Sequence, residues 1–360
     1  MSPFIMRKQG YLRFDKEITG IVKAFAIIFM MILHCYCTEN YDVSLDFSHS
    51  LINGFSWIFK ICVGMFVFMV GYGYAFSNDK DLKYSFKHIK KLLIPFWIIL
   101  FVFTFPFCYG RVISDFRTLI YNLVGIDSSY NYYSWFVYFF IYAMCVMPFI
   151  SRFINRNPLK NTVIVIVIAY ILVAFVHELP RCLALFGITI PLVIDNKPHL
   201  AFFNCLMMTP CMVLGYLFAC KGYYERIRLG TFSKIAIVVL CLLVIIFSLV
   251  LKYYTYIEHN PINLDLFYAP LVIGAIAVLF NEIECFYLRK LLCIIGQVSV
   301  YMWFFHALFF TKSVRWFYQP IITIFDDINL VVLWTIVLTF FVSWILKSIV
   351  DVVLRHIKCI

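Results

Sequence analysis

A lysine and a histidine eleven residues apart in one apolar stretch are the residues of this chain best placed for chemistry. Lys23 and His34 are the only basic residues of the run ITGIVKAFAIIFMMILHCY. An ionisable side chain inside a segment long enough to cross a bilayer costs free energy, so it indicates a functional site. Eleven residues of an α-helix return almost to the same face and span roughly 16 Å. The spacing therefore predicts a cation and an imidazole on one face of a membrane helix.

This spacing is close to the reach of the acyl-pantetheine arm of coenzyme A. Phosphates held at Lys23 would leave the nucleotide in water and bring a thioester to His34, with Lys87, Lys90 and Lys91 supplying further charge. A neutral imidazole there could accept the proton of an attacking hydroxyl. The alternatives are a snorkelling lysine, a histidine that hydrogen-bonds between helices, and a basic loop that only sets topology.

Three other polar residues inside apolar stretches are candidates for supporting roles. His306 and Tyr301 lie five residues apart and could orient the donor or the acceptor, or form structural hydrogen bonds between helices. Lys60 needs a partner or water and could bind the acceptor. Four more polar residues lie near the outer ends of the fifth and sixth apolar stretches, where they either contact the acceptor or are merely solvated. They are His177, Glu178, Asp195 and His199.

The composition places the chain in the membrane-protein class. Of its 360 residues, 64% are hydrophobic and only 14% are charged, which is too apolar for a soluble fold of this length. The net charge of +11 comes from basic residues dispersed between apolar runs, so no nucleic-acid partner is expected. The thirteen cysteines show no paired spacing and are interpreted as small hydrophobic residues, with no metal expected.

We expect an all-α integral membrane protein with about ten transmembrane helices and a single domain over residues 1–360. Each apolar run is near the ~20 residues that a bilayer requires. The second run is the longest and should tilt or extend into the interface. Residues 183–193 are apolar but short and contain Pro191, so we interpret them as an interfacial or re-entrant piece. The ten expected helices cover residues 20–37, 51–77, 92–109, 133–151, 161–178, 199–220, 234–253, 264–283, 293–312 and 328–349.

The distribution of basic residues predicts the orientation of these helices. The segments on the N-terminal side of the membrane hold 21 Lys and Arg residues, and the segments on the other side hold 7. Because Lys and Arg are enriched in cytoplasmic loops, both termini are predicted to be cytoplasmic. The expected location is the cell (plasma or inner) membrane.

Five segments stand in a fixed order along most of the chain. They are ITGIVKAFAIIFMMILHCY, GMFVFMVGYGYAFS, KHIKKLLIPFW ending at Pro95, SWFVYFFIYAMCVMP with Trp135 and Pro148, and IGQVSVYMWFFHALFF with Gly296, Ser299, Tyr301 and His306. In residue types, order and spacing they resemble blocks of the membrane acyltransferase-3 family. The departures are Lys23, Lys87 and Lys90, where the family usually carries arginine; lysine keeps the charge but loses bidentate phosphate recognition.

The resemblance implies transfer of an acyl group, usually acetyl, from cytosolic acyl-CoA to a hydroxyl of an extracytoplasmic glycan. His34 would be the essential residue, and the partners would be acetyl-CoA or another acyl-CoA, a surface polysaccharide or lipid-linked glycan, and membrane lipids. The alternative is a ten-span transporter that exports a small organic anion or a glycan. A transporter predicts internal repeats with paired Gly/Pro breaks, and we find no convincing repeat between the two halves.

Overall fold

Within the residues that the structure describes, ten helices are long and apolar enough to cross a membrane. A computed structural model describes residues 11–37, 41–42, 44–47, 55–77, 81–184, 197–228, 233–257, 263–283 and 285–358. The fold is 83% helical and, in these ranges, has no β-strand. The prediction of an all-α membrane protein with ten transmembrane helices is confirmed.

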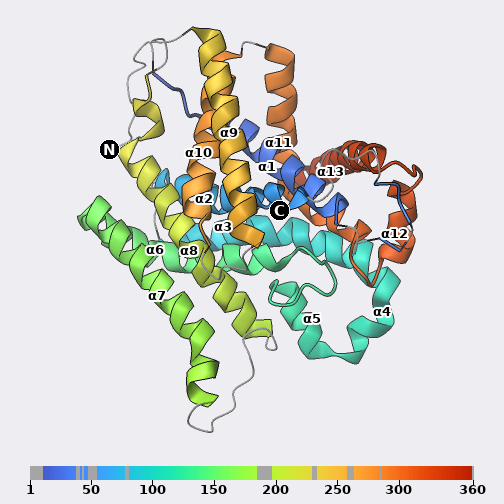
Figure 1. The fold of residues 1–360 in the computed structure, drawn as a ribbon. Coiled ribbons are helices and arrows are strands. Elements are labelled where there is room, and N and C mark those ends of the chain that lie inside the picture. The colour runs from blue at the N-terminus through green and yellow to red at the C-terminus, as the bar shows by residue number, and fades with distance from the viewer. Residues whose placement is uncertain are drawn as a thin grey trace.

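Figure 1 shows the elements in their order along the chain. The short elements are η2 (Ser56–Lys60), η3 (Leu100–Thr104), α4 (Phe105–Ser114), α5 (Phe116–Leu123), η5 (Tyr224–Arg226), η6 (Ala307–Phe309) and α12 (Arg315–Ile322). The long helices are α1 (Lys16–Cys35), α2 (Ile61–Ala75), α3 (Leu82–Ile99), α6 (Trp135–Arg156), α7 (Pro158–Ala184), α8 (Lys197–Lys221), α9 (Lys234–Ile257), α10 (Asp265–Glu282), α11 (Phe286–His306) and α13 (Ile328–Lys358).

The observed helices differ from the expected runs mainly at their ends. The third span covers Leu82–Gly110 rather than 92–109, because its basic first turns are also helical and Asp81 caps them by accepting from the Tyr84 amide at 2.8 Å. The second span begins at Ser56 rather than residue 51; residues 51–54 lie outside the described residues. Of the expected interfacial piece, residues 183–184 end α7 and the remainder also lies outside them.

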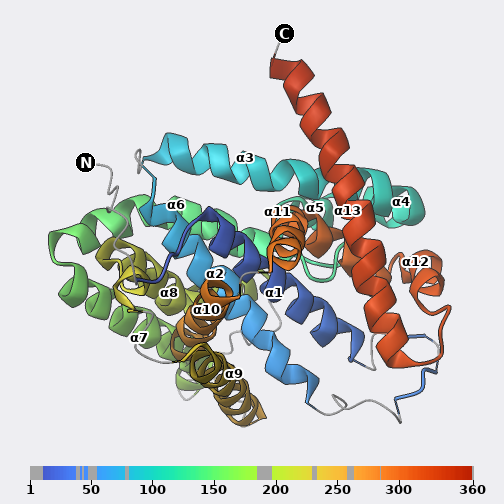
Figure 2. The ribbon, with the colours of Figure 1, turned by 90° about the horizontal axis from the view of Figure 1, so that it is seen from above.

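Helix α1 is the centre of the arrangement. It packs against α2, α11 and α13, and Figure 2 shows these helices around it. Its first turn is capped by Asp15, whose carboxylate accepts from the Glu17 and Ile18 amides. Helices α7 and α9 lie at the edge of the molecule, and their membrane windows are the least buried of the ten (Figures 1 and 2). The polar residues of α1 are therefore enclosed by other helices and not by lipid alone.

One end of the bundle collects the N-terminal segment and several helix ends; we call it the N-terminal face. Phe14 stacks on Tyr224 with ring centroids 4.7 Å apart and lies against Tyr72 at the end of α2. At the start of α11, the Arg289 guanidinium donates to the Glu17 carboxylate at 2.7 Å. That this face is the cytoplasmic one stays a prediction from the charge count.

Candidate active site

Two histidines from distant parts of the chain meet inside the bundle, at the end opposite to the N-terminal face. His34 lies in the last turn of α1 and His306 ends α11. His34 Nδ1 and His306 Nε2 are 2.9 Å apart, and the two rings are within 3° of coplanar. His306 is completely buried and His34 is half-buried. The two imidazoles are thus joined edge to edge by one hydrogen bond.

The surroundings of His306 decide how protons are placed on this pair. His306 Nδ1 lies 3.0 Å from the Met302 carbonyl oxygen, which can only accept, so Nδ1 of His306 carries the proton. In a neutral ring Nε2 then has the lone pair and accepts from His34 Nδ1–H. The proton of His34 is therefore on Nδ1, and its Nε2 carries the lone pair of a base. His306 holds His34 in the tautomer and orientation that a general base needs, as the aspartate does in a hydrolase triad.

A third ring fixes the face of the His34 imidazole. Tyr133 stacks on it with ring centroids 3.3 Å apart and planes within 2°. The segment that carries Tyr133 is tied to the end of α11, because the Trp303 indole donates to the Tyr133 carbonyl at 3.0 Å and the Asn131 amide donates to the Phe304 carbonyl at 2.9 Å. His306 of α11 therefore holds one edge of the His34 ring, and Tyr133 holds one face. The segment that carries Tyr133 is itself attached to α11.

Lys23 lies on the same unbroken helix as His34, eleven residues nearer the N-terminal face. Its side chain is exposed, and within the described part of the chain it forms no ion pair. The residues between them on this face of α1 are buried: Ala26 is 1%, Ile27 0% and Met30 7% exposed. An acyl arm lying along this face must therefore displace side chains, of which the flexible Met30 moves most easily.

The other predicted donor-binding lysines lie on a different helix from Lys23. Lys87, Lys90 and Lys91 are exposed along the first half of α3. Helix α3 packs mainly on α6 and α11, whereas α1 packs on α2, α11 and α13. Their donor-binding role stays a prediction.

Of the two remaining supporting candidates, the structure brings one towards the histidine pair. Lys60, at the end of η2, acts electrostatically on His34 and lies 5.6 Å from the centre of the Trp57 ring. Tyr301 is buried on α11 and lies within electrostatic range of Asp351 on α13. Five helical residues separate it from His306 by about 140°, so it belongs to another face of α11.

The polar group near the outer ends of the fifth and sixth spans is only partly described. His177 hydrogen-bonds the adjacent Glu178 at 2.6 Å, and both side chains are exposed at the end of α7. Asp195 lies outside the described residues. His177 and Glu178 therefore form an exposed pair and do not contribute to the histidine site.

Sequence reasoning missed three features. Tyr133 lies in an aromatic run that resembles an interfacial belt. The Met302 carbonyl is a backbone group that no residue type marks. Lys252, one of the seven basic residues counted on the side opposite to the N-terminal side, lies within α9 and forms a buried ion pair with Asp265, Nζ to Oδ1 2.5 Å. A lysine inside an apolar run was the only available signal for that pair.

The family comparison agrees with this geometry. A family model described as an acyltransferase domain matches residues 20–348, nearly the whole chain. The chain belongs to the acyltransferase-3 family. This acyltransferase-3 protein is thus a multi-pass membrane acyltransferase, and its histidine pair lies within the matched region. The comparisons with curated proteins and with solved structures returned no match.

Proposed function

We propose that this protein is a transmembrane O-acyltransferase that moves an acetyl group from cytosolic acetyl-CoA to a hydroxyl of an extracytoplasmic surface glycan. The observation that carries the proposal is the His34–His306 hydrogen bond, which leaves a lone pair on His34 Nε2. Membership of an acyltransferase family favours this reaction over transport through the same ten helices.

The proposed chemistry needs one base and one leaving group. His34 Nε2 accepts the proton of the acceptor hydroxyl while the oxygen of that hydroxyl attacks the thioester carbonyl carbon. The C–S bond then breaks, the coenzyme A thiolate leaves, and it takes the proton back from His34. While His34 is an imidazolium, its Nδ1–H donates to His306 Nε2 as a charge-assisted hydrogen bond. His306 thus stabilises the protonated state as well as the orientation of the base.

The donor would enter from the N-terminal face, which the charge distribution predicts to be cytoplasmic. Lys23 would bind a phosphate near this side, and the pantetheine arm would extend roughly 16 Å along α1 to His34. Lys87, Lys90 and Lys91 would raise the local concentration of the anionic donor. The acceptor, a surface polysaccharide or a lipid-linked glycan, would approach His34 from the opposite side of the plasma membrane.

The test is to measure base-labile acetate on surface glycans of cells with and without the protein. We expect the acetate to be lost with His34→Ala at normal protein levels and kept with His177→Ala, a histidine of α7 whose side chain is 37% exposed. Purified protein should release free coenzyme A from acetyl-CoA only when acceptor is present. Acetylation that persists in His34→Ala would remove His34 as the base. Release that does not depend on acceptor would contradict direct transfer to a hydroxyl.

A further inference from the structure

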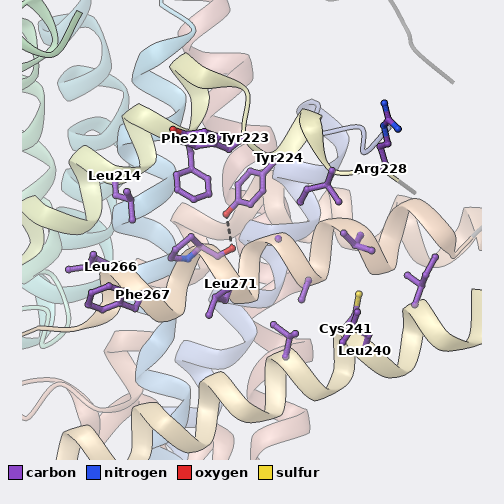
Figure 3. A pocket seen from close by; sticks show the side chains of 17 residues that line it. Leu214, Phe218, Tyr223, Tyr224, Arg228, Leu240, Cys241, Leu266, Phe267 and Leu271 are labelled. Atoms are coloured by element: carbon purple, nitrogen blue, oxygen red, sulfur yellow. Dashed lines mark hydrogen bonds between the residues drawn. The ribbon is translucent and has the colours of Figure 1, made fainter. Parts of the chain in front are cut away.

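A groove between α8, α9 and α10 is distinct from the histidine site. Its volume is about 690 Å³, within the ~300–1,000 Å³ typical of sites for small molecules. Figure 3 shows Leu214 and Phe218 of α8 on one wall, Leu240 and Cys241 of α9 on the facing wall, and Leu271 of α10 between them. All these helices cross the membrane, so the groove lies at hydrocarbon depth.

The groove opens sideways from the bundle. Leu240, Phe267 and Leu271 line it and are 56%, 57% and 48% exposed, whereas Cys241 and Ala275, which also line it, are buried. At this depth an exposed side chain meets lipid and not water. An apolar cavity open to the bilayer is filled by hydrocarbon.

One end of the groove carries a cation. Arg228 lines it from the connection between α8 and α9, at the N-terminal face, and Figure 3 shows it beyond Tyr224, away from the apolar walls. Its Nε donates to the Tyr11 hydroxyl at 3.0 Å, which orients the guanidinium. The terminal nitrogens keep the planar geometry that suits a phosphate. Glu225, three residues earlier in the chain, accepts from the Tyr72 hydroxyl through Oε1 at 2.8 Å.

The wall of the groove is held open by fixed contacts. The Tyr224 hydroxyl donates to the Pro270 carbonyl at 2.7 Å (Figure 3), and its ring stacks on Phe14. Burial raises the pKa of Tyr224 well above its usual range, so the phenol keeps the proton that it donates. A Cβ on Gly274 would lie 3.1 Å from Tyr224 Cε1, so a larger residue would fill part of the space. The groove is therefore a built feature of the fold.

We infer that this groove binds one acyl chain of an anionic phospholipid from the leaflet on the N-terminal face, with the lipid phosphate on Arg228. The apolar walls at hydrocarbon depth accept the chain. The guanidinium lies at the end of the groove, where α8 ends and α9 begins, which is the level of the headgroups. A single cation at the end of an apolar groove matches the charge pattern of a phospholipid.

Photolabelling of the full-length protein tests the site. The probe is phosphatidylglycerol with a diazirine on one acyl chain, and labelled peptides are mapped by mass spectrometry. We expect labels on the groove-lining parts of α9 and α10, within residues 237–244 and 266–278. Ala275→Phe should reduce labelling about ten-fold, and Leu243→Phe, outside the groove on α9, should not. Labels spread equally over other lipid-facing helices such as α7 would overturn the inference.

The charge is tested separately with the matched phosphatidylcholine probe. Wild-type protein should prefer the anionic probe, Arg228→Gln should lose this preference, and Arg226→Gln, an exposed arginine outside the groove, should keep it. Equal labelling by both probes in the wild type would contradict the role of Arg228. Competition by palmitoyl-CoA but not by phospholipid would assign the groove to a donor chain instead. A dimer that protects the groove from the probe would assign it to a second copy.

Discussion

Gly296 of α11 contacts the backbone of Gly20 of α1 so closely that a Cβ on Gly296 would lie 2.0 Å from the Gly20 carbonyl oxygen. Such a distance is far inside van der Waals contact, so only glycine permits this approach of the two helices. The Arg289–Glu17 ion pair lies on one side of the contact and the histidine pair on the other. The register of α11 on α1, and hence the 2.9 Å hydrogen bond, depends on this contact.

Gly296→Ala should therefore reduce activity without touching a reacting group. The added methyl must push α11 from α1, and overpacking of this kind costs about 1–3 kcal/mol. We expect a fall in kcat of about ten-fold or more together with a lower Tm. Gly73→Ala on α2 is the control, because a Cβ at Gly73 meets nothing within 4 Å. Wild-type kcat in Gly296→Ala would show that the histidine pair tolerates a shift of α11.

Replacing His306 tests its role as the group that positions the base. His306→Leu removes the acceptor for His34 Nδ1–H, and kcat should fall about 100-fold with little change in the KM for acetyl-CoA. His306→Gln can place an amide oxygen near the position of Nε2, so it should recover part of kcat.

The comparison of these two variants separates positioning from packing. If His306 only fills space, Leu should be tolerated at least as well as Gln, because it is the more apolar of the two. Equal activity of the two variants, or a loss confined to KM, would contradict the proton arrangement inferred from the Met302 carbonyl. Initial rates at varied acetyl-CoA, with folding checked by size-exclusion chromatography, provide the measurement.

The ten helices could be predicted from sequence because each leaves an apolar run of bilayer length. Their ends could not. An apolar run marks the hydrocarbon layer, whereas the hydrogen-bonded helix continues to its cap, as α3 does from Leu82 after Asp81. The start of the second run stays a prediction, because residues 51–54 lie outside the described residues and the described helical part begins at Ser56.

Half of the site could be predicted in the same way. Lys23 and His34 lie on one helix, so local spacing relates them. The partner of His34 is 272 residues away, and helical periodicity carries no information about the register of two distant helices. That register comes from the glycine contact at Gly296, whose neighbour Gly20 becomes known only when the helices are packed. Tyr133 precedes its helix, where an aromatic residue normally indicates only the membrane interface.

The buried ion pair between Lys252 and Asp265 should stabilise the folded protein. The two side chains are 10% and 3% exposed. Lys252→Met leaves an unpaired buried carboxylate, which costs about 3–5 kcal/mol, so Tm should fall strongly. Adding Asp265→Asn removes the remaining charge and should recover much of the loss.

The control is the partly exposed Lys347–Asp351 pair of α13, whose side chains are 33% and 41% exposed. An i,i+4 pair of this kind contributes roughly 0–1 kcal/mol, so Lys347→Met should change Tm much less than Lys252→Met does. Thermal unfolding of the detergent-purified variants, followed by loss of the monodisperse peak, gives the comparison. A double variant no more stable than Lys252→Met would show that the damage comes from lost packing and not from the unpaired charge.

Lys23 should affect binding of the donor more than the chemical step. This exposed residue lies on α1 near the N-terminal face, roughly 16 Å from the base, so its ammonium can contact a phosphate but not the thioester. Lys23→Ala should raise the KM for acetyl-CoA about ten-fold, because it removes one charge-assisted hydrogen bond, and should leave kcat nearly unchanged. Lys23→Arg should keep or lower the KM, since a guanidinium binds phosphate through two parallel hydrogen bonds.

The control for a general loss of positive charge is Lys16→Ala, because Lys16 is an exposed lysine in the first turn of the same helix. If Lys16→Ala raises the KM as much as Lys23→Ala does, the donor responds to the basic surface as a whole, and Lys23 has no specific contact with it.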